Sequence, residues 1–235
     1  MKRSEINKIM RDAVGFAEEH GFKLPPFVTW SPEDWKTKGA EYDEVRKCML
    51  GWDITDYGKG DFRKAGLLML TIRNGSLDQA KGKTYAEKML IVEECQITPY
   101  HFHWNKTEDI INRGGGILCI QLYNSTEDGK FADTNVTVSK DGRKYTVSAG
   151  SIVEVMPGES ITLTTGLYHQ FWGKDGCGKI LVGEISKIND DNVDNRFYEN
   201  IERFPEIEED EGPLYLLFSE YPDAVCEAEY YEKKN

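Results

Sequence analysis

A long succession of short apolar segments, separated by glycine and Asx turns, fills the sequence from about Gly66 onward. Their apolar residues follow the two-residue period of strands, and Asp141-Gly142 is a strong signal for a tight hairpin. No helical segments alternate with them, so the pattern predicts a mainly β fold, either a barrel or a double-sheet sandwich. The predicted strands cover residues 67–73, 85–98, 116–123, 135–139, 144–147, 151–155, 160–163, 169–172 and 179–185, with a further strand at 214–218.

The residues before these strands have a helical pattern. Apolar side chains recur at helical spacing over residues 4–20, and Ser4 is the predicted N-cap. Further helices are predicted from Ser31 and over about 41–49, followed by a loop at 51–58. These helices are too few and too mixed to form a domain of their own.

A chain of 235 residues is long enough for one sizeable core. We expect a single domain over residues 1–235, in which a mostly helical extension (1–65) packs on a β-barrel core (66–220). The five cysteines are odd in number and include no C-x-x-C pair. This pattern argues against a disulfide framework and against a zinc ribbon.

The charge of the chain limits its partners. A net charge of −12 argues against binding to nucleic acid or to an anionic membrane. No apolar run is long enough to cross a bilayer, and the N-terminus lacks the apolar core of a signal peptide, so we expect a cytoplasmic protein. The acidic run at residues 206–211 is predicted to be a solvated loop.

The pattern H-x-H-x4-E is the strongest chemical signal in the sequence. His101 and His103 project from the same face of an extended strand, and Glu108 follows them closely. Two imidazoles and a carboxylate suit a divalent first-row metal ion. His169 is the candidate for a fourth ligand, and the cluster would then use three of the four histidines in the chain. A lone H-x-H pair is common by chance, so the prediction rests on its surroundings.

Those surroundings resemble the two sequence motifs of cupins. The first motif places H-x-H, a glutamate and a glycine at the spacing seen from His101 to Gly115, and the second places glycines and a histidine at the spacing of Gly158, Gly166 and His169. Three positions depart from the motifs, namely Cys95, Thr164 and Gly173, and none of them is a ligand. The resemblance implies a cupin double-stranded β-helix, or jelly-roll barrel, which agrees with the strand pattern.

Longer strings resemble the D-lyxose isomerase family, over nearly the whole chain up to about residue 220. They are residues 1–4, 50–53, 85–88, 98–104, 108–116, 157–160, 166–169, 171–172, 181–184 and 189–191. The resemblance implies a cytoplasmic enzyme that is usually manganese-dependent and homodimeric. It also implies a small-molecule sugar substrate, with interconversion of D-lyxose and D-xylulose and often of D-mannose and D-fructose.

Such an isomerase moves a proton between C1 and C2 of the sugar through an enediol. Four protein ligands would leave two positions open on an octahedral Mn²⁺ or Co²⁺ ion, enough for a chelating sugar, whereas a structural zinc site is closed. Glu184 is the candidate base, with a pKa raised by apolar neighbours if it is buried, or else a hydrogen-bond partner of a ligand. Lys88, if buried, can stabilise the developing negative charge; otherwise it is a solvated lysine.

The sugar-binding residues are less well determined by the sequence. Lys106 is a weak candidate, because its place between two ligands suggests exposure to solvent. Asp190 and Arg203 can close the mouth of the site, although each is also an ordinary surface charge. Trp52 can supply an aromatic wall for the sugar, and packing in the core is an equal alternative.

Three other functions stay open at this point. A phosphosugar isomerase would need a cationic cradle for phosphate, and few lysines or arginines cluster around the motif. A cupin dioxygenase would use the same ligands to bind iron and oxygen. A non-catalytic sugar-binding cupin commonly lacks a complete ligand set, whereas this chain keeps all four candidates.

Overall fold

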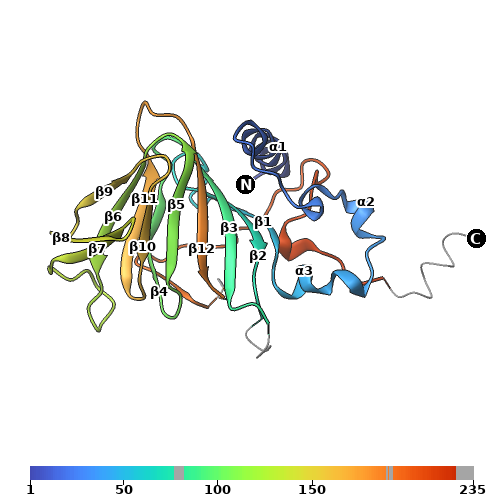
Figure 1. Ribbon diagram of the computed structural model, residues 1–235. Coiled ribbons are helices and arrows are strands. Elements are labelled where there is room, and N and C mark those ends of the chain that lie inside the picture. Colours follow the sequence, from blue (N-terminus) through green and yellow to red (C-terminus); the bar gives the residue numbers. More distant parts are fainter. Residues whose placement is uncertain (77–81, 189, 191–192, 226–235) are drawn as a thin grey trace, which may run out of the picture.

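A computed structural model describes residues 1–76, 82–188, 190 and 193–225 of the chain. Within these residues, antiparallel strands form an eight-stranded sheet and a five-stranded sheet (Figure 1). The order in the larger sheet is β1-β2-β3-β12-β5-β10-β7-β8, and in the smaller one β13-β4-β11-β6-β9. The strands are β1 (Gly51–Thr55), β2 (Leu67–Arg73), β3 (Tyr85–Val92), β4 (Thr98–His103), β5 (Glu108–Gly115), β6 (Leu118–Asn124), β7 (Val136–Lys140), β8 (Arg143–Val147), β9 (Ile152–Val155), β10 (Ser160–Leu163), β11 (Leu167–Gly173), β12 (Ile180–Lys187) and β13 (Asn195–Phe197).

The strands alternate between the two sheets along the chain. β3, β5, β10 and β12 lie in the larger sheet, while β4, β6, β9 and β11 lie in the smaller one. This alternation is that of a jelly roll, the double-sheet arrangement found in cupins. The predicted fold class is therefore confirmed, with β7 and β8 added as a hairpin at one edge and β1 and β2 at the other (Figure 1).

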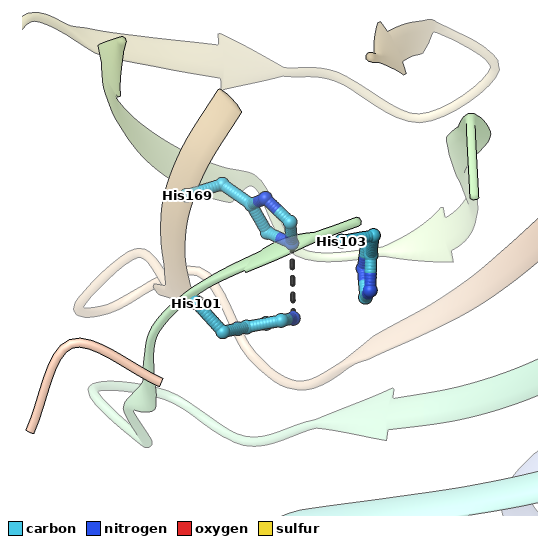
Figure 2. A group of neighbouring side chains, drawn as sticks. All are labelled: His101, His103 and His169. Carbon is cyan, nitrogen blue, oxygen red and sulfur yellow. Dashed lines mark hydrogen bonds between the residues drawn. The ribbon is translucent and has the colours of Figure 1, made fainter. Parts of the chain in front are cut away.

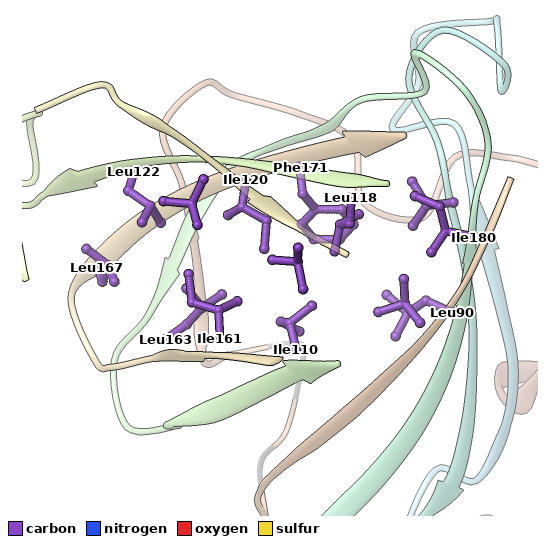
Figure 3. Packing of buried hydrophobic residues seen from close by; sticks show 14 of the residues in the cluster. Leu90, Ile110, Leu118, Ile120, Leu122, Ile161, Leu163, Leu167, Phe171 and Ile180 are labelled. Carbon is purple, nitrogen blue, oxygen red and sulfur yellow. The ribbon is translucent and has the colours of Figure 1, made fainter. Parts of the chain in front are cut away.

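The main hydrophobic core lies between the two sheets. Buried side chains from both sheets meet there, including Leu90 and Ile110 from the larger sheet and Leu122 and Phe171 from the smaller one (Figure 3). The same inward faces also carry two polar side chains. His169 of β11 lies two positions from Leu167 and from Phe171, and Glu184 of β12 lies two positions from Val182. Because successive strand residues point to opposite faces, the core strands also aim these polar side chains inward.

A second core lies on the outer face of the larger sheet. There α1 (Arg3–Glu19) packs its apolar side against Leu68, Leu70 and Ile91, which point away from the barrel interior. Parts of β2 and β3 are thus buried on both faces, so residues 67–70 and 89–92 are continuously apolar instead of alternating. The remaining short helices are η1 (Pro26–Thr29), α2 (Pro32–Trp35), η2 (Ala40–Tyr42), α3 (Asp43–Lys47) and η3 (Phe218–Glu220). None of the described helices is long and apolar enough to span a membrane.

The N-terminus of α1 differs from the prediction. Lys2 occupies the N-cap position, and Ser4 lies inside the helix, where its backbone N–H and hydroxyl donate to Asp210. The Arg3 guanidinium, only 2% exposed, pairs with Glu209 and Glu220. Residues 206–211 form a largely exposed loop, as predicted, and two of its carboxylates, Glu209 and Asp210, also bind the buried arginine and the N-terminus of α1.

Two other predictions about strands were wrong. Residues 51–58 were expected to form a loop, but Gly51–Thr55 is strand β1, so the sheet begins within the proposed helical extension. Residues 214–218 form no strand, and Leu217 makes only an isolated bridge to Trp52. Strands β5 and β13 were not predicted.

Cys95 occupies a turn in which the cupin motif has glycine. Its φ of 57° lies in the left-handed region, where a Cβ atom is unfavourable by about 1–2 kcal/mol. We expect Cys95→Gly to raise the free energy of unfolding by up to about 1 kcal/mol. Relief of the backbone strain should outweigh the stability lost because glycine makes the unfolded chain more flexible. Urea unfolding measures this change. Cys95→Ala is the control that keeps the Cβ atom, and equal stability of both variants would contradict the assignment of strain.

Candidate active site

A cavity with about 450 Å³ of empty space, including its open mouth, lies between the sheets at one end of the core. Ionisable side chains reach it from both sheets: Lys88 from β3, His101 and His103 from β4, and Glu108 and Glu184 from the larger sheet. All of these side chains are buried. A group of ionisable side chains buried in one cavity is the usual signature of a functional site.

Three histidines converge beside this cavity (Figure 2). One ring nitrogen from each of His101, His103 and His169 lies within 4.8 Å of the other two. His101 and His169 stand opposite each other across the β4–β11 pair, and a bulge in β4 turns Thr98 toward the same cavity. The Glu108 Oε1 atom is 3.2 Å from His103 Nε2 and 3.4 Å from His169 Nε2. The structure therefore brings all four predicted ligands together.

The hydrogen bonds of two histidines fix their tautomers. His101 Nδ1 is 2.9 Å from the Pro99 carbonyl oxygen, and His169 Nδ1 is 3.0 Å from that of Leu167. A carbonyl oxygen only accepts, so both Nδ1 atoms carry hydrogen and both Nε2 atoms present lone pairs. Those Nε2 atoms are 3.0 Å apart. Two lone pairs directed at each other in a buried site fit a shared cation.

Burial keeps these imidazoles neutral. Burial and the neighbouring His169 and His103 hold the pKa of His101 well below its ordinary value. Burial also lowers the pKa of His169 to about 4, although Glu108 opposes the shift. Neutral imidazole is the form that binds a metal ion, so both side chains are ready to act as ligands at neutral pH.

Glu108 supplies the negative charge of the ligand set. Burial alone would raise the pKa of its carboxyl, but Lys106, His103 and His169 outweigh burial and hold that pKa well below its usual range. Three imidazoles, one carboxylate and no thiolate in the described cluster form a donor set that fits a divalent first-row ion. His103 Nδ1 is buried without a hydrogen-bond partner among the described residues.

A chain of alternating charges leads away from the histidines. Lys106 Nζ is 2.7 Å from Glu108 Oε2 and 2.9 Å from Glu184 Oε1, and Lys88 Nζ is 3.3 Å from the same Glu184 oxygen. The strand register places Glu184 directly opposite Lys88. Lys88 is buried, as it must be if it stabilises the developing negative charge. The expected exposure of Lys106 was wrong, because it is only 2% exposed. Glu184 stands opposite the apolar Ile110, as its expected surroundings require, but it also pairs with two ammonium groups that the sequence did not reveal.

The predicted sugar-binding residues have different outcomes. Arg203 lines the cavity and pairs with Asp53 of β1, with Nη1 donating to Oδ1 at 3.1 Å. Trp52, the residue before Asp53 on β1, points to the opposite face, where its indole N–H donates to the Val28 carbonyl oxygen at 2.8 Å. Asp190 does not line the cavity, and its backbone carbonyl accepts from Val193 and Asp194. The structure therefore brings Arg203 to the site but not Trp52 or Asp190.

The cavity also contains residues that the sequence did not reveal. Tyr57, Asn195 and Phe197 line it, yet they belong to a turn and to the three-residue strand β13. β13 pairs with β4 so that Asn195 faces His103 and Phe197 faces His101. The sequence offers only a weak signal for these three residues, namely the presence of aromatic residues near the C-terminal end of the β region.

Comparison with known proteins gives concordant matches. Residues 1–221 match the family model described as D-lyxose isomerase. A D-lyxose/D-mannose isomerase of Serratia proteamaculans is 48% identical over 224 residues, which cover 94% of this chain and 98% of that protein. A protein of the same name from Escherichia coli O157:H7 is 46% identical over 226 residues, with coverages of 94% and 98%.

Solved structures with the same fold are more distant in sequence. The L-ribose isomerase of Cellulomonas parahominis, solved with L-ribose, has a TM-score of 0.55 at 14% identity and covers 86% of this chain and 95% of its own. The L-ribose isomerase of Geodermatophilus obscurus has a TM-score of 0.54 at 13% identity, with coverages of 88% and 98%. At such identities, these similarities support the fold alone.

Proposed function

Because this chain belongs to the D-lyxose isomerase family and is an aldose–ketose isomerase, we propose that it interconverts D-lyxose with D-xylulose and D-mannose with D-fructose. The reaction moves a proton between C1 and C2 of the open-chain sugar through a cis-enediol. The observation that carries the proposal is the convergence of three histidines beside one cavity that is lined by a buried lysine–glutamate chain.

The metal ligands in this proposal are His101, His103, Glu108 and His169. The donor set suits a divalent ion, and we propose Mn²⁺, with Co²⁺ as a substitute. When bound, the ion supplies Lewis acidity to the carbonyl and the adjacent hydroxyl of the sugar. All other steps belong to the side chains of the chain itself.

Glu184 takes the proton from carbon and returns it to the neighbouring carbon on the same face of the enediol. It is buried and lines the cavity, where a carboxylate can reach the bound sugar. Lys106 and Lys88 hold its position through their ion pairs. The two ammonium groups also stabilise the negative charge that develops on the sugar oxygens.

The charge balance of the cavity supports this division of roles. Lys88 and Lys106 carry two positive charges, and Glu108 and Glu184 carry two negative charges, so this group is neutral when its members are ionised. A divalent ion held by the histidines and Glu108 would therefore add net positive charge to this group. An enediolate is stabilised by that positive charge more than the neutral sugar is, as catalysis requires.

A free sugar fits the cavity better than a phosphosugar. The basic residues that line it within the described chain are Lys88, Lys106 and Arg203, apart from the histidines. Each of them is paired with a carboxylate, so none forms a dedicated phosphate cradle. Arg203, which is held by Asp53 and lines the cavity, instead offers donors for sugar hydroxyls. The homodimer and the cytoplasmic location implied by the family resemblance stay predictions.

The proposed reaction is tested by incubating the manganese-loaded protein with D-lyxose in D₂O under measured oxygen. We expect D-xylulose that carries deuterium at C1, without oxygen uptake, because the abstracted proton exchanges with solvent on the base. Complete retention of the original C2 hydrogen at C1 would contradict the proton-transfer path. Oxygen uptake without a ketose product would instead support the dioxygenase.

A further inference from the structure

The turn between β4 and β5 connects two ligand strands and carries Lys106. It covers residues 104–107, between His103 and Glu108. Within it, Lys106 reaches back into the cavity and contacts both a proposed metal ligand and the proposed base. The position of this one ammonium group therefore depends on the conformation of a four-residue turn.

Asp194 holds that turn from a distant part of the chain. Its carboxylate Oδ1 accepts from the Asn105 backbone N–H at 2.8 Å and from the Asn105 side-chain amide at 3.1 Å. Its Oδ2 accepts from the Lys106 backbone N–H at 3.2 Å, and its carbonyl oxygen accepts from Trp104 N–H at 3.1 Å. Three successive backbone N–H groups of the turn are thus satisfied by one residue, which is only 4% exposed.

The position of Asp194 is itself fixed by the site. It directly precedes β13, which pairs with the ligand strand β4 in the register Asn195 to His103 and Phe197 to His101. A carboxylate suits this position because it is acceptor-only and faces three donors. An apolar side chain would leave the buried Lys106 N–H group without its acceptor, and such unpaired groups are strongly disfavoured.

From these contacts we infer that Asp194 is a positioning residue of the isomerase reaction, which sets the placement of the Lys106 ammonium between Glu108 and Glu184. This inference rests on the proposed function. Asp194 acts through Lys106 and touches neither the sugar nor the metal ligands. Removal of the Asp194 carboxylate should lower kcat, because small displacements of a catalytic group lower the rate strongly. The three-histidine cluster should stay intact.

The direct test is Asp194→Asn, which keeps the shape but turns one acceptor into a donor facing the Lys106 N–H. We expect kcat for D-lyxose to fall about 10- to 100-fold, with a smaller change in KM and full metal content. Hydrogen exchange at the Asn105 and Lys106 amides should become faster, a readout that does not depend on activity. Asp61→Asn is the matched control, because Asp61 also accepts from two backbone N–H groups, of Arg63 and Lys64, in a turn that carries no residue of the cavity.

A double-mutant cycle separates this role from a general loss of stability. In a Lys106→Met background, Asp194→Asn should have no further effect on kcat, while its effect on amide exchange persists. Additive losses of kcat would overturn the inference. If Asp194→Asn does not fold, Asn105→Ala deletes one donor to Asp194, and an unchanged kcat there would also overturn it. A wild-type protein that forms no ketose would instead refute the proposed function itself.

Discussion

Replacing His103 with alanine should abolish both metal binding and isomerisation. His103 is buried at the centre of the site, with Nε2 3.2 Å from Glu108 Oε1 and its ring close to that of His169. Loss of a residue that only orients a ligand commonly costs 10- to 100-fold in metal affinity, so loss of a ligand should cost at least about 100-fold. We expect the rate of D-xylulose formation to fall at least about 1,000-fold, because the metal and its Lewis acidity are lost together.

The chain provides a matched control for this experiment. His20 is the one histidine outside the cluster, at the end of α1, where its Nδ1 is 2.9 Å from the Phe16 carbonyl oxygen. His20→Ala should keep metal content and activity. Elemental analysis and a ketose assay measure both variants, and circular dichroism checks that they fold. If His103→Ala and its larger counterpart His103→Gln both keep full turnover without detectable metal, the ligand assignment is incorrect.

Replacing Glu184 with glutamine should remove turnover but keep the metal. The amide has the shape of the carboxylate but cannot accept a proton from carbon. We expect kcat to fall about 100- to 10,000-fold, the usual range for loss of a general base. Metal content should stay at the wild-type level, because Glu184 is separated from the histidines by Lys106 and Glu108. Loss of turnover with full metal content would identify Glu184 as the base and not as a metal ligand.

The control for Glu184→Gln is a glutamate in an ion pair far from the cavity. Glu154 lies on β9 and pairs with Lys174 at 2.7 Å, with both side chains exposed to solvent. Glu154→Gln should leave kcat unchanged and alter stability little, as is usual for surface ion pairs. A fully active Glu184→Gln variant would show that Glu184 only positions Lys88 and Lys106 and that another group takes the proton.

The cluster of candidate metal ligands could be predicted from the sequence because its signals are local. His101 and His103 need only an extended strand to point the same way, and Glu108 follows within one turn. His169 required the second cupin motif, since only the fold brings β11 beside β4. The barrel was also predictable from local patterns, because apolar and polar residues alternate in most core strands and the strands end at glycine or Asx turns.

The supporting residues could not be predicted because their roles depend on distant contacts. Lys106 appears in a polar turn and reads as exposed, yet Asp194, 88 residues later, folds that turn inward. Asp53 lies on β1, a strand whose two faces are buried by different layers, so its sequence shows no alternation. β13 has only three residues, and its pairing with β4 provides almost no pattern in the sequence.

The central claim is that a divalent metal ion at the histidine cluster and the neighbouring lysine–glutamate chain together isomerise a free sugar. The most direct test strips the wild-type protein of metal with a chelator and assays D-lyxose after adding Mn²⁺, Co²⁺, Mg²⁺ or Zn²⁺ in turn. We expect no D-xylulose from the stripped protein and recovery with Mn²⁺ at one ion per chain. Full turnover by stripped protein, with no metal detectable by elemental analysis, would contradict the claim.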